Sequence, residues 1–206
     1  MAVSTPDERR TRIADAALTL LAREGARGLT HRAVDVELQL PSGSTSYYCR
    51  TRSALLLAAA ERLLELDTAD MTRVSDDRAG VASLLDRWLS PAGRMRSLAR
   101  MELLLAAARD PELGFMARAR ERFIDHAVAA QRGSASGEDP QAARLTATAL
   151  IALVDGLTLH GLVTGELTRS AAQKMLEQLR NSPRAARSTI RRTPVKKPKP
   201  RTRAAR

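Results

Sequence analysis

"LPSGSTSYYCRTRSALL", residues 40–56, is the stretch that decides the predicted fold. It sets a run of hydroxyl side chains, one glycine and the chain's two tyrosines between two apolar, alanine-rich segments. Pro41 ends the preceding helix, and Ser42 can cap a short helix over residues 43–49. A long helix is expected to follow from about Ala54. Two short helices joined by a tight turn and followed by a long helix are typical of a helix-turn-helix head.

The segments before this stretch supply the rest of the head. Thr5 and Glu8 form a capping box around Pro6, which predicts that the first helix begins there. Its apolar residues recur at helical spacing as far as Gly25, a natural C-terminal stop. Thr30 can cap a second, short helix. The head is therefore expected to contain three helices.

The remainder of the chain also has the pattern of helices. A cap residue precedes proline at 90–91 and again at 139–140, and each pair predicts a helix start. The helix after the second pair is apolar nearly all round, so we expect it to be buried on more than one side. β-Branched and aromatic residues are sparse, which favours an all-α fold. The predicted units are a three-helix head at 1–52, a larger helical body at 53–181 and a basic tail at 182–206.

The positive charge of the chain is concentrated in the tail. The net charge is +11, and residues 184–206 contribute ten basic residues and no acidic ones. The rest of the chain therefore carries only +1, so the high isoelectric point describes the tail rather than the folded part. With almost nothing to bury, the tail is expected to be disordered. It can add phosphate contacts that are independent of DNA sequence, or it can simply be solvated.

Several classes of protein are disfavoured by the composition. The single cysteine excludes an intrachain disulfide and a multi-thiolate metal site, and the three histidines form no spaced ligand set, so we expect no metal and no cofactor. No triad or paired carboxylates indicate an enzyme. No uninterrupted apolar segment reaches about 18 residues, and the N-terminus lacks the pattern of a signal peptide. A soluble, cytoplasmic protein without a membrane partner is the expectation.

The serine-rich stretch suits a surface that binds DNA. A recognition helix presents short hydrogen-bonding side chains at its start and is anchored to phosphates by nearby cations. Tyrosine can reach a phosphate or contact a thymine methyl group. The alternative is that the hydroxyls are only helix caps and that the tyrosines are half-buried packing residues. The candidate DNA-binding residues are Thr30, His31, Arg32, Ser42, Gly43, Ser44, Thr45, Ser46, Tyr47, Tyr48, Arg50 and Arg52.

The first sixty residues resemble the DNA-binding head of the TetR family of transcriptional repressors. The recognition segment of that family typically reads Gly-Val-Ser-x-Gly-Thr-Leu-Tyr-x-His-Phe, and this chain has "QLPSGSTSYYC". Gly43 matches the family glycine, and Ser44 stands in place of the threonine. The resemblance implies that Tyr48 takes the place of a phosphate-contacting histidine. It also implies that Arg52 takes the place of the lysine that opens the fourth helix and grips the DNA backbone.

Three residues depart from the family pattern. Gln39 replaces the usual turn glycine, so the backbone there is expected to be less left-handed or mildly strained. Ser46 stands where tyrosine is commonest, which leaves that phosphate contact to Tyr47 or loses it. Cys49 replaces an apolar phenylalanine. Its thiol either senses oxidants beside Arg50 or is a small core residue, and we favour the core role.

The resemblance further implies a homodimer and a small-molecule effector. Two heads about 34–36 Å apart would read a palindrome far better than one. The predicted dimer stripe consists of Leu150, Leu153, Val154, Leu157 and Gly161. Ile151, Thr158 and Leu162 line another side of the same helix, and the alternative is that this helix is only a core helix. The candidate effector-pocket residues are Trp88, Met101, Leu104, Phe115, Phe123, His126 and Asp155, of which any one is more often plain core.

Together these patterns predict a sequence-specific DNA-binding transcriptional regulator. We expect a homodimeric repressor that a small-molecule effector releases from a palindromic operator of double-stranded DNA. The alternative is an architectural, nucleoid-type DNA binder that is dominated by the basic tail and has no effector.

Overall fold

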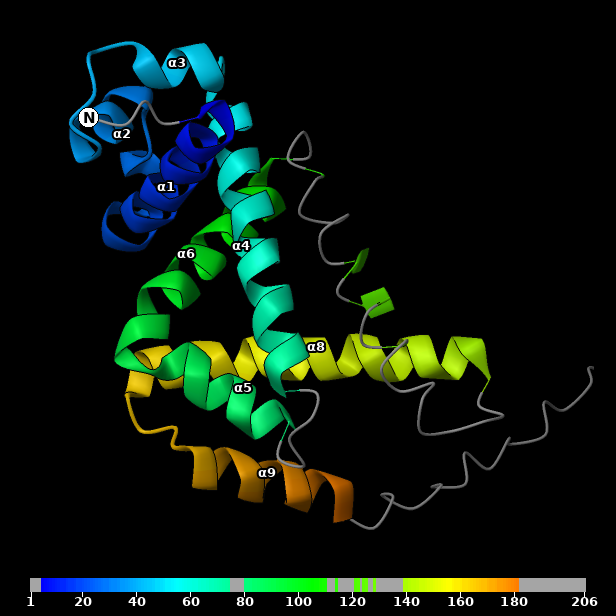
Figure 1. Ribbon diagram of the computed structural model, residues 1–206. Coiled ribbons are helices and arrows are strands. Elements are labelled where there is room, and N and C mark those ends of the chain that lie inside the picture. The colour runs from blue at the N-terminus through cyan, green and yellow to red at the C-terminus, as the bar shows by residue number, and fades with distance from the viewer. Residues whose placement is uncertain are drawn as a thin grey trace, which may run out of the picture.

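The computed structural model describes residues 5–74, 80–110, 114, 121, 122, 124, 125, 128 and 139–181. Figure 1 shows helices α1, α2 and α3 as a head at one end of the molecule and helices α8 and α9 at the other. Helices α4 and α6 lie between these ends. The bounds are α1 Pro6–Gly28, α2 His31–Glu37, α3 Ser44–Tyr48, α4 Arg52–Val74, α5 Gly80–Leu89, α6 Pro91–Arg109, α8 Pro140–Thr164 and α9 Arg169–Asn181.

The predicted helix starts are confirmed by their hydrogen bonds. The Thr5 N–H donates to Oε2 of Glu8 at 2.8 Å, and the Glu8 N–H donates to Oγ1 of Thr5 at 3.2 Å. Ser90 and Asp139 cap α6 and α8, each followed by proline. Gly25 interrupts α1 with φ of 71°, but the helix resumes beyond this kink and ends at Gly28 rather than at the predicted stop.

The head and the body share one hydrophobic core. Large apolar side chains of α1, α2 and α4 pack with α6 residues such as Leu103, which is 1 % exposed. Because α4 begins at Arg52 and runs into the body, the head is attached to the body through both α4 and α6. The fully buried members of this core include Ile13, Leu20, Leu21, Leu29, Val34, Leu55, Leu56 and Leu103. The division at residue 52 stays a prediction, and residues 182–206 lie outside the described residues.

The body packs α5 against α8 and α9. Trp88 of α5, Val154 of α8 and Ala172 of α9 belong to one buried cluster. Gly161 of α8 lies so close to α5 that an added Cβ would come within 2.4 Å of Leu89 Cδ1. The opposite side of α8 is open to solvent, so the expectation that this helix is buried on more than one side is wrong for the single chain.

Candidate DNA-binding surface and effector site

The turn between α2 and α3 is organised around the carboxylate of Asp35. Oδ1 accepts hydrogen bonds from the Thr45 N–H at 2.8 Å and the Thr45 hydroxyl at 2.6 Å, and Oδ2 accepts one from the Gly43 N–H at 2.8 Å. Burial by itself raises the pKa of Asp35, but the hydrogen bonds from Thr45 and Gly43 outweigh burial and hold the pKa below its ordinary value. The buried carboxylate therefore fixes where α3 begins.

This arrangement corrects the expectation for Thr45. Its side chain is fully buried, and its hydroxyl is bonded to Asp35. A DNA contact by the Thr45 side chain does not fit that geometry, because the hydroxyl faces the protein interior. The sequence does not reveal this burial, since the four serine and threonine residues of 42–46 are chemically alike.

The backbone of the turn contains two left-handed residues. Gln39 has φ of 54°, so it keeps the left-handed conformation although it is not glycine, and it carries the strain that β-carbons suffer there. Gly43 has φ of 90° and is the N-cap of α3 without a side-chain cap. The prediction that Ser42 caps α3 is therefore wrong, and Ser42 is exposed. The Ser44 hydroxyl instead donates to the Pro41 carbonyl at 2.6 Å.

The two tyrosines of α3 occupy different environments. The Tyr47 side chain is 81 % exposed, together with exposed Ser46 and Arg50 beside it. Tyr48 is half-buried and packs against the core of the head. The rings meet edge to face, with centroids 5.1 Å apart. Tyr47 is thus the residue of the pair that is presented to a partner, and Tyr48 mainly supports it.

The start of α2 adds further groups beside α3. Thr30 caps α2 as predicted, since its hydroxyl accepts from the Ala33 N–H at 3.1 Å. Arg32 is exposed. His31 Nε2 lies 2.6 Å from the carbonyl oxygen of Cys49, so this nitrogen carries the proton and donates it to the carbonyl. His31 therefore joins α2 to the end of α3.

Arg52 and Glu102 both hold the kink of α1. The Arg52 guanidinium donates to the carbonyl of Ala26, one residue beyond Gly25. Oε2 of Glu102, on α6, accepts from the Ala26 N–H at 2.9 Å. The Arg52 side chain, predicted to grip the DNA backbone, is thus engaged within the protein. The same contacts connect the head to the body at its kinked helix.

Cys49 is a core residue. It is buried at the end of α3, and burial raises the pKa of its thiol although the positive charge of Arg10 lowers it. A thiol with a raised pKa is a poor thiolate source, which argues against oxidant sensing.

The predicted effector residues do not converge on one described cavity. The Trp88 ring is buried beneath the guanidinium of Arg100, which lies 3.5 Å from the ring centroid. Met101 is half-buried, and Leu104 packs against the core shared by head and body. Asp155 is half-buried on α8. Phe115, Phe123 and His126 lie outside the described residues.

Two buried aspartates of α4 pair with arginines of α6. Asp67 accepts a bidentate pair from Arg100, at 3.1 Å from Nε and 2.5 Å from Nη2. Asp70 is 2 % exposed and accepts a direct hydrogen bond from Arg96. These pairs fasten α4 to α6 near the buried face of α5. Sequence reasoning missed them, although Asp67 and Asp70 at one helical spacing and Arg96 and Arg100 at another were a usable signal.

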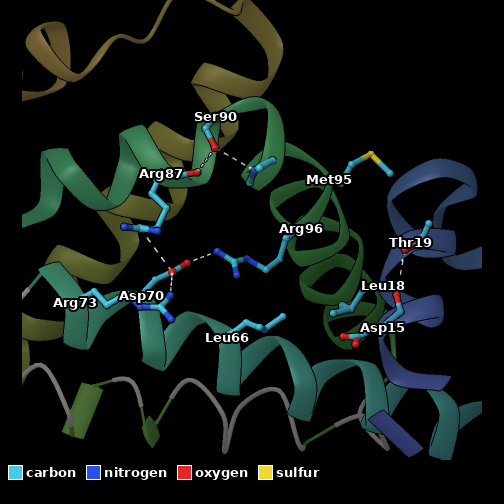
Figure 2. A pocket seen from close by; sticks show the side chains of 12 residues that line it. Asp15, Leu18, Thr19, Leu66, Asp70, Arg73, Arg87, Ser90, Met95 and Arg96 are labelled. Carbon is cyan, nitrogen blue, oxygen red and sulfur yellow. Dashed lines mark hydrogen bonds and ion pairs between the residues drawn. The ribbon is translucent and has the colours of Figure 1, made fainter. Parts of the chain in front are cut away.

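A cavity of about 460 Å³ opens beside these pairs, between α1, α4, α5 and α6. Figure 2 shows Arg73, Arg87 and Arg96 converging on Asp70 at one side of it. Met95 lies at its edge next to α1. We call this space the junction cavity.

The predicted dimer stripe on α8 mostly faces its own chain. Val154 is buried in the cluster with Trp88, and Leu157 packs against that cluster. Gly161 is buried against Leu89. Val154 and Gly161 are therefore not available to a partner, whereas Leu157 is half-buried. Leu150 and Leu153 are half-buried at the margins of the helix. The stripe was misplaced because α8 is apolar on both sides and the sequence alone does not say which side meets α5.

Comparison with known proteins identifies the family. Residues 74–182 match the model of the tetracyclin repressor-like C-terminal domain. The chain belongs to the TetR family. It is 27 % identical over 168 residues to the nicotine-responsive transcriptional repressor HdnoR of Paenarthrobacter nicotinovorans, with 78 % of this chain and 86 % of the relative covered.

Two solved TetR-type structures are similar to the chain over most of its length. One is a TetR-family member from Streptomyces coelicolor A3, with 30 % identity, a TM-score of 0.68 and coverage of 84 % of this chain and 98 % of that one. The other is the multidrug binding protein EbrR complexed with ethidium, with 32 % identity, a TM-score of 0.66 and coverage of 85 % and 99 %.

Membership of the TetR family settles the class of function. The chain is a DNA-binding transcriptional regulator, as the serine-rich stretch and its helix order predicted. The alternative of an architectural binder dominated by the basic tail is not favoured. TetR-family proteins are regulators and are generally not enzymes.

Proposed function

We propose that the protein is a homodimeric cytoplasmic repressor that reads a palindromic operator through α3 and the start of α2. The observation that carries this proposal is the exposed face of the head. Arg32, Ser42, Ser46, Tyr47 and Arg50 are all exposed, and Figure 1 shows α3 at the outer end of the head, away from α5, α8 and α9. Hydroxyls, a phenol ring and guanidinium groups are the donors that contact base edges and phosphates.

Removal of the Tyr47 ring tests the DNA surface. Because that side chain is 81 % exposed, Tyr47→Ala should leave the free energy of unfolding within about 0.5 kcal/mol of the parent. Its affinity for the operator should fall by about 1–3 kcal/mol, or roughly 5- to 150-fold. A footprint on the DNA upstream of the gene supplies the operator, and fluorescence anisotropy measures the affinity. Thr146→Glu, on exposed α8 far from the head, is the matched control. Unchanged affinity of Tyr47→Ala would refute the assignment of this face.

The proposed dimer contact is the exposed side of α8. Leu145, Leu159 and Val163 are 71 %, 50 % and 77 % exposed, and they share one side of the helix with Ala149, Ala152 and Gly156. An added Cβ at Gly156 would meet nothing within 4 Å, so this side has room for a second helix. The stripe runs about 27 Å along the axis, at 1.5 Å per residue.

A second copy is the occupant that best fits this stripe. A two-fold axis sets the same apolar face of α8 against itself, which buries it in a four-helix contact with α9 of each subunit. Helix α8 is also long enough, and apolar enough at a mean hydropathy of 1.5 over its best window, to cross a membrane. However, the other side of α8 packs on α5, as in the core helix of a soluble protein, and α8 lies within residues 74–182, which match the tetracyclin repressor-like C-terminal domain.

A charge on the stripe tests the dimer. Val163→Glu should yield a monomer in analytical ultracentrifugation, because the carboxylate would be buried without a partner at the contact. Thr146→Glu, exposed on the same helix but away from the stripe, should remain a dimer. A dimeric Val163→Glu protein would contradict this contact.

We also propose that a small molecule releases the repressor from DNA. Two similar proteins support this proposal, since HdnoR is nicotine-responsive and EbrR binds ethidium. An effector acts by binding the state with displaced heads more tightly than the state that fits DNA. Helices α4 and α6 are the coupling elements, because both contact the core of the head and the buried ion pairs of the body. A screen for compounds that raise the thermal midpoint and reduce operator binding tests this step.

A further inference from the structure

The junction cavity has an excess of positive charge. Arg73 Nη1 and Arg87 Nε lie 3.5 Å and 3.7 Å from the same oxygen, Oδ1 of Asp70, while Arg96 already bonds the other oxygen. The Asp70 carboxylate thus faces three guanidinium groups, and Nε of Arg96 also lies 3.7 Å from Oδ1 of the buried Asp67. The second acid of the lining, Asp15, is paired with Arg62 at 2.8 Å.

The guanidinium groups retain unused donors. Each guanidinium has five N–H groups, whereas the Asp70 carboxylate offers about four lone-pair sites to all three. The Nε of Arg96 is buried and lies 3.7 Å from Oδ1 of Asp67, but it makes no hydrogen bond in the part of the chain that the structure describes. Arg73 and Arg87 reach Asp70 only at long distances, and their side chains are 64 % and 46 % exposed. The cavity is therefore prepared for a second anion.

The other wall of the cavity is apolar. Leu18 of α1, Leu66 of α4 and Met95 of α6 line it opposite the arginines. The N-terminus of α6, capped by Ser90, also borders the cavity and adds a partial positive charge. A volume of about 460 Å³ is within the usual range of small-molecule sites.

We propose that the junction cavity binds a small organic carboxylate, with the acid on Arg73 and Arg87 and the apolar body against Leu18, Leu66 and Met95. A planar guanidinium matches a carboxylate in bidentate geometry, which makes these contacts stronger than neutral hydrogen bonds. A cationic ligand of the same size would face three guanidinium groups. Of the two acids in the described lining, Asp15 is already paired with Arg62, which leaves Asp70 to attract the cation. The site should therefore prefer acids, whereas the ligand named for EbrR is the dye ethidium.

The place of the cavity gives such a ligand a regulatory effect, and this part rests on the proposed function. Leu18 and Thr19 belong to α1 of the head, while Met95 and Arg96 belong to α6 of the body. The same two helices are joined at the kink, where Glu102 accepts from Ala26. A molecule wedged between α1 and α6 therefore changes how the head is held.

Calorimetric titration of the full chain with paired probes tests the site. The probes are aryl and alkyl monocarboxylates such as benzoate and octanoate, their matched primary amines, and inorganic phosphate. We expect at least one monocarboxylate to bind, its amine to show no binding, and phosphate to bind more weakly because it lacks the apolar contact. Equal binding of acid and amine, equal binding of benzoate, octanoate and phosphate, or no acid binding at millimolar concentration would overturn the proposal.

Variants locate the binding. The doubly substituted Arg73→Gln, Arg87→Gln protein should bind the acid at least tenfold more weakly, since it loses two charge-assisted contacts. The Arg73 side chain is mostly exposed and that of Arg87 is about half exposed, so circular dichroism should show an intact fold. Arg109→Gln, an exposed charge in the last turn of α6, is the control and should bind as the parent does. Equal weakening by both proteins would show that the effect is general charge and would overturn the site.

The two proposals fail in different ways. If an acid binds through Arg73 and Arg87 but operator affinity does not change, the site stands and its regulatory effect fails. If the chain binds no operator at all, the proposed function fails while the titration still reports on the cavity.

Discussion

Replacing Asp35 with asparagine should loosen α3 while keeping nearly the same shape in the turn. If the amide oxygen faces Thr45, the amide nitrogen faces the Gly43 N–H, and two donors oppose each other. Three hydrogen bonds to a charged group, at about 2 kcal/mol each, are replaced by two neutral ones at about 1 kcal/mol each. An amide is easier to bury than a carboxylate, which offsets part of the difference of about 4 kcal/mol. We expect a net destabilisation of about 2–3 kcal/mol.

Urea unfolding followed by circular dichroism measures this change. The midpoint should fall with an unchanged slope, and operator affinity should fall with it because α3 is no longer held in place. Asp15→Asn is the control: that carboxylate is about half exposed and pairs with Arg62, so its loss should cost under about 1 kcal/mol. Equal destabilisation by the two variants would refute the claim that Asp35 positions α3.

The difference between parent and Asp35→Asn should also depend on pH. The folded-state pKa of Asp35 is lowered, so the folded state favours the ionised form more than the unfolded state does. The resulting stability is fully present above the ordinary carboxyl value of about 4 and is lost as pH falls through the lowered pKa. Stability curves of the two proteins should therefore converge below about pH 4. A constant difference down to pH 2 would contradict the conclusion that the Asp35 carboxylate is ionised in the folded protein.

Three further outcomes follow from buried contacts. Arg100→Met should destabilise the fold by about 3–5 kcal/mol in urea unfolding, because the Asp67 carboxylate stays buried without its partner. Adding Asp67→Leu should restore most of that stability. A double variant as unstable as Arg100→Met would contradict the pairing. Glu102→Ala should cost about 1–2 kcal/mol by leaving the Ala26 N–H at the kink without its acceptor, whereas a neutral effect would show that the contact is dispensable. Cys49 should react slowly with iodoacetamide at pH 7 in the folded protein and quickly in urea, since burial raises its pKa and covers its sulfur; rapid labelling of the native chain would refute this.

Local signals made the helix starts of this chain predictable. A cap followed by proline acts within four residues, so Thr5, Ser90 and Asp139 could be assigned without knowing the fold. The helix-turn-helix order was predictable for the same reason, because its turn and its short helices are set by residues near each other in the chain. The family segment then pointed to the class of function.

The side that each residue faces was much less predictable. Thr45 and Ser46 are both small hydroxyl residues of α3, yet one is fully buried and the other is exposed. The difference arises from Asp35, ten residues before Thr45, whose carboxylate reaches α3 only once the turn has formed. On α8 both sides are apolar, so hydrophobic periodicity could not separate the side of Val154 from the side of Val163.

The junction cavity was the least predictable feature, because it depends on four helices meeting. Asp70 and Arg96 are 26 residues apart, and the helical spacings of Asp67 with Asp70 and of Arg96 with Arg100 do not by themselves pair one helix with the other. Only their burial against one another shows that they form a charged lining. Arg73 and Arg87 likewise belong to this lining because both lie beside the carboxylate of Asp70.

The stacking of Arg100 on Trp88 makes tryptophan fluorescence an intrinsic probe of the conformation of the body. This indole is the chain's single tryptophan, so all of its tryptophan emission originates at one known place, where α4, α5 and α6 come together. A guanidinium 3.5 Å from the ring centroid gives that emission an environment that any sliding of α6 along α5 would alter. Rearrangement of the regulator on DNA or with a ligand can thus be followed in the unlabelled protein, in real time and at low concentration.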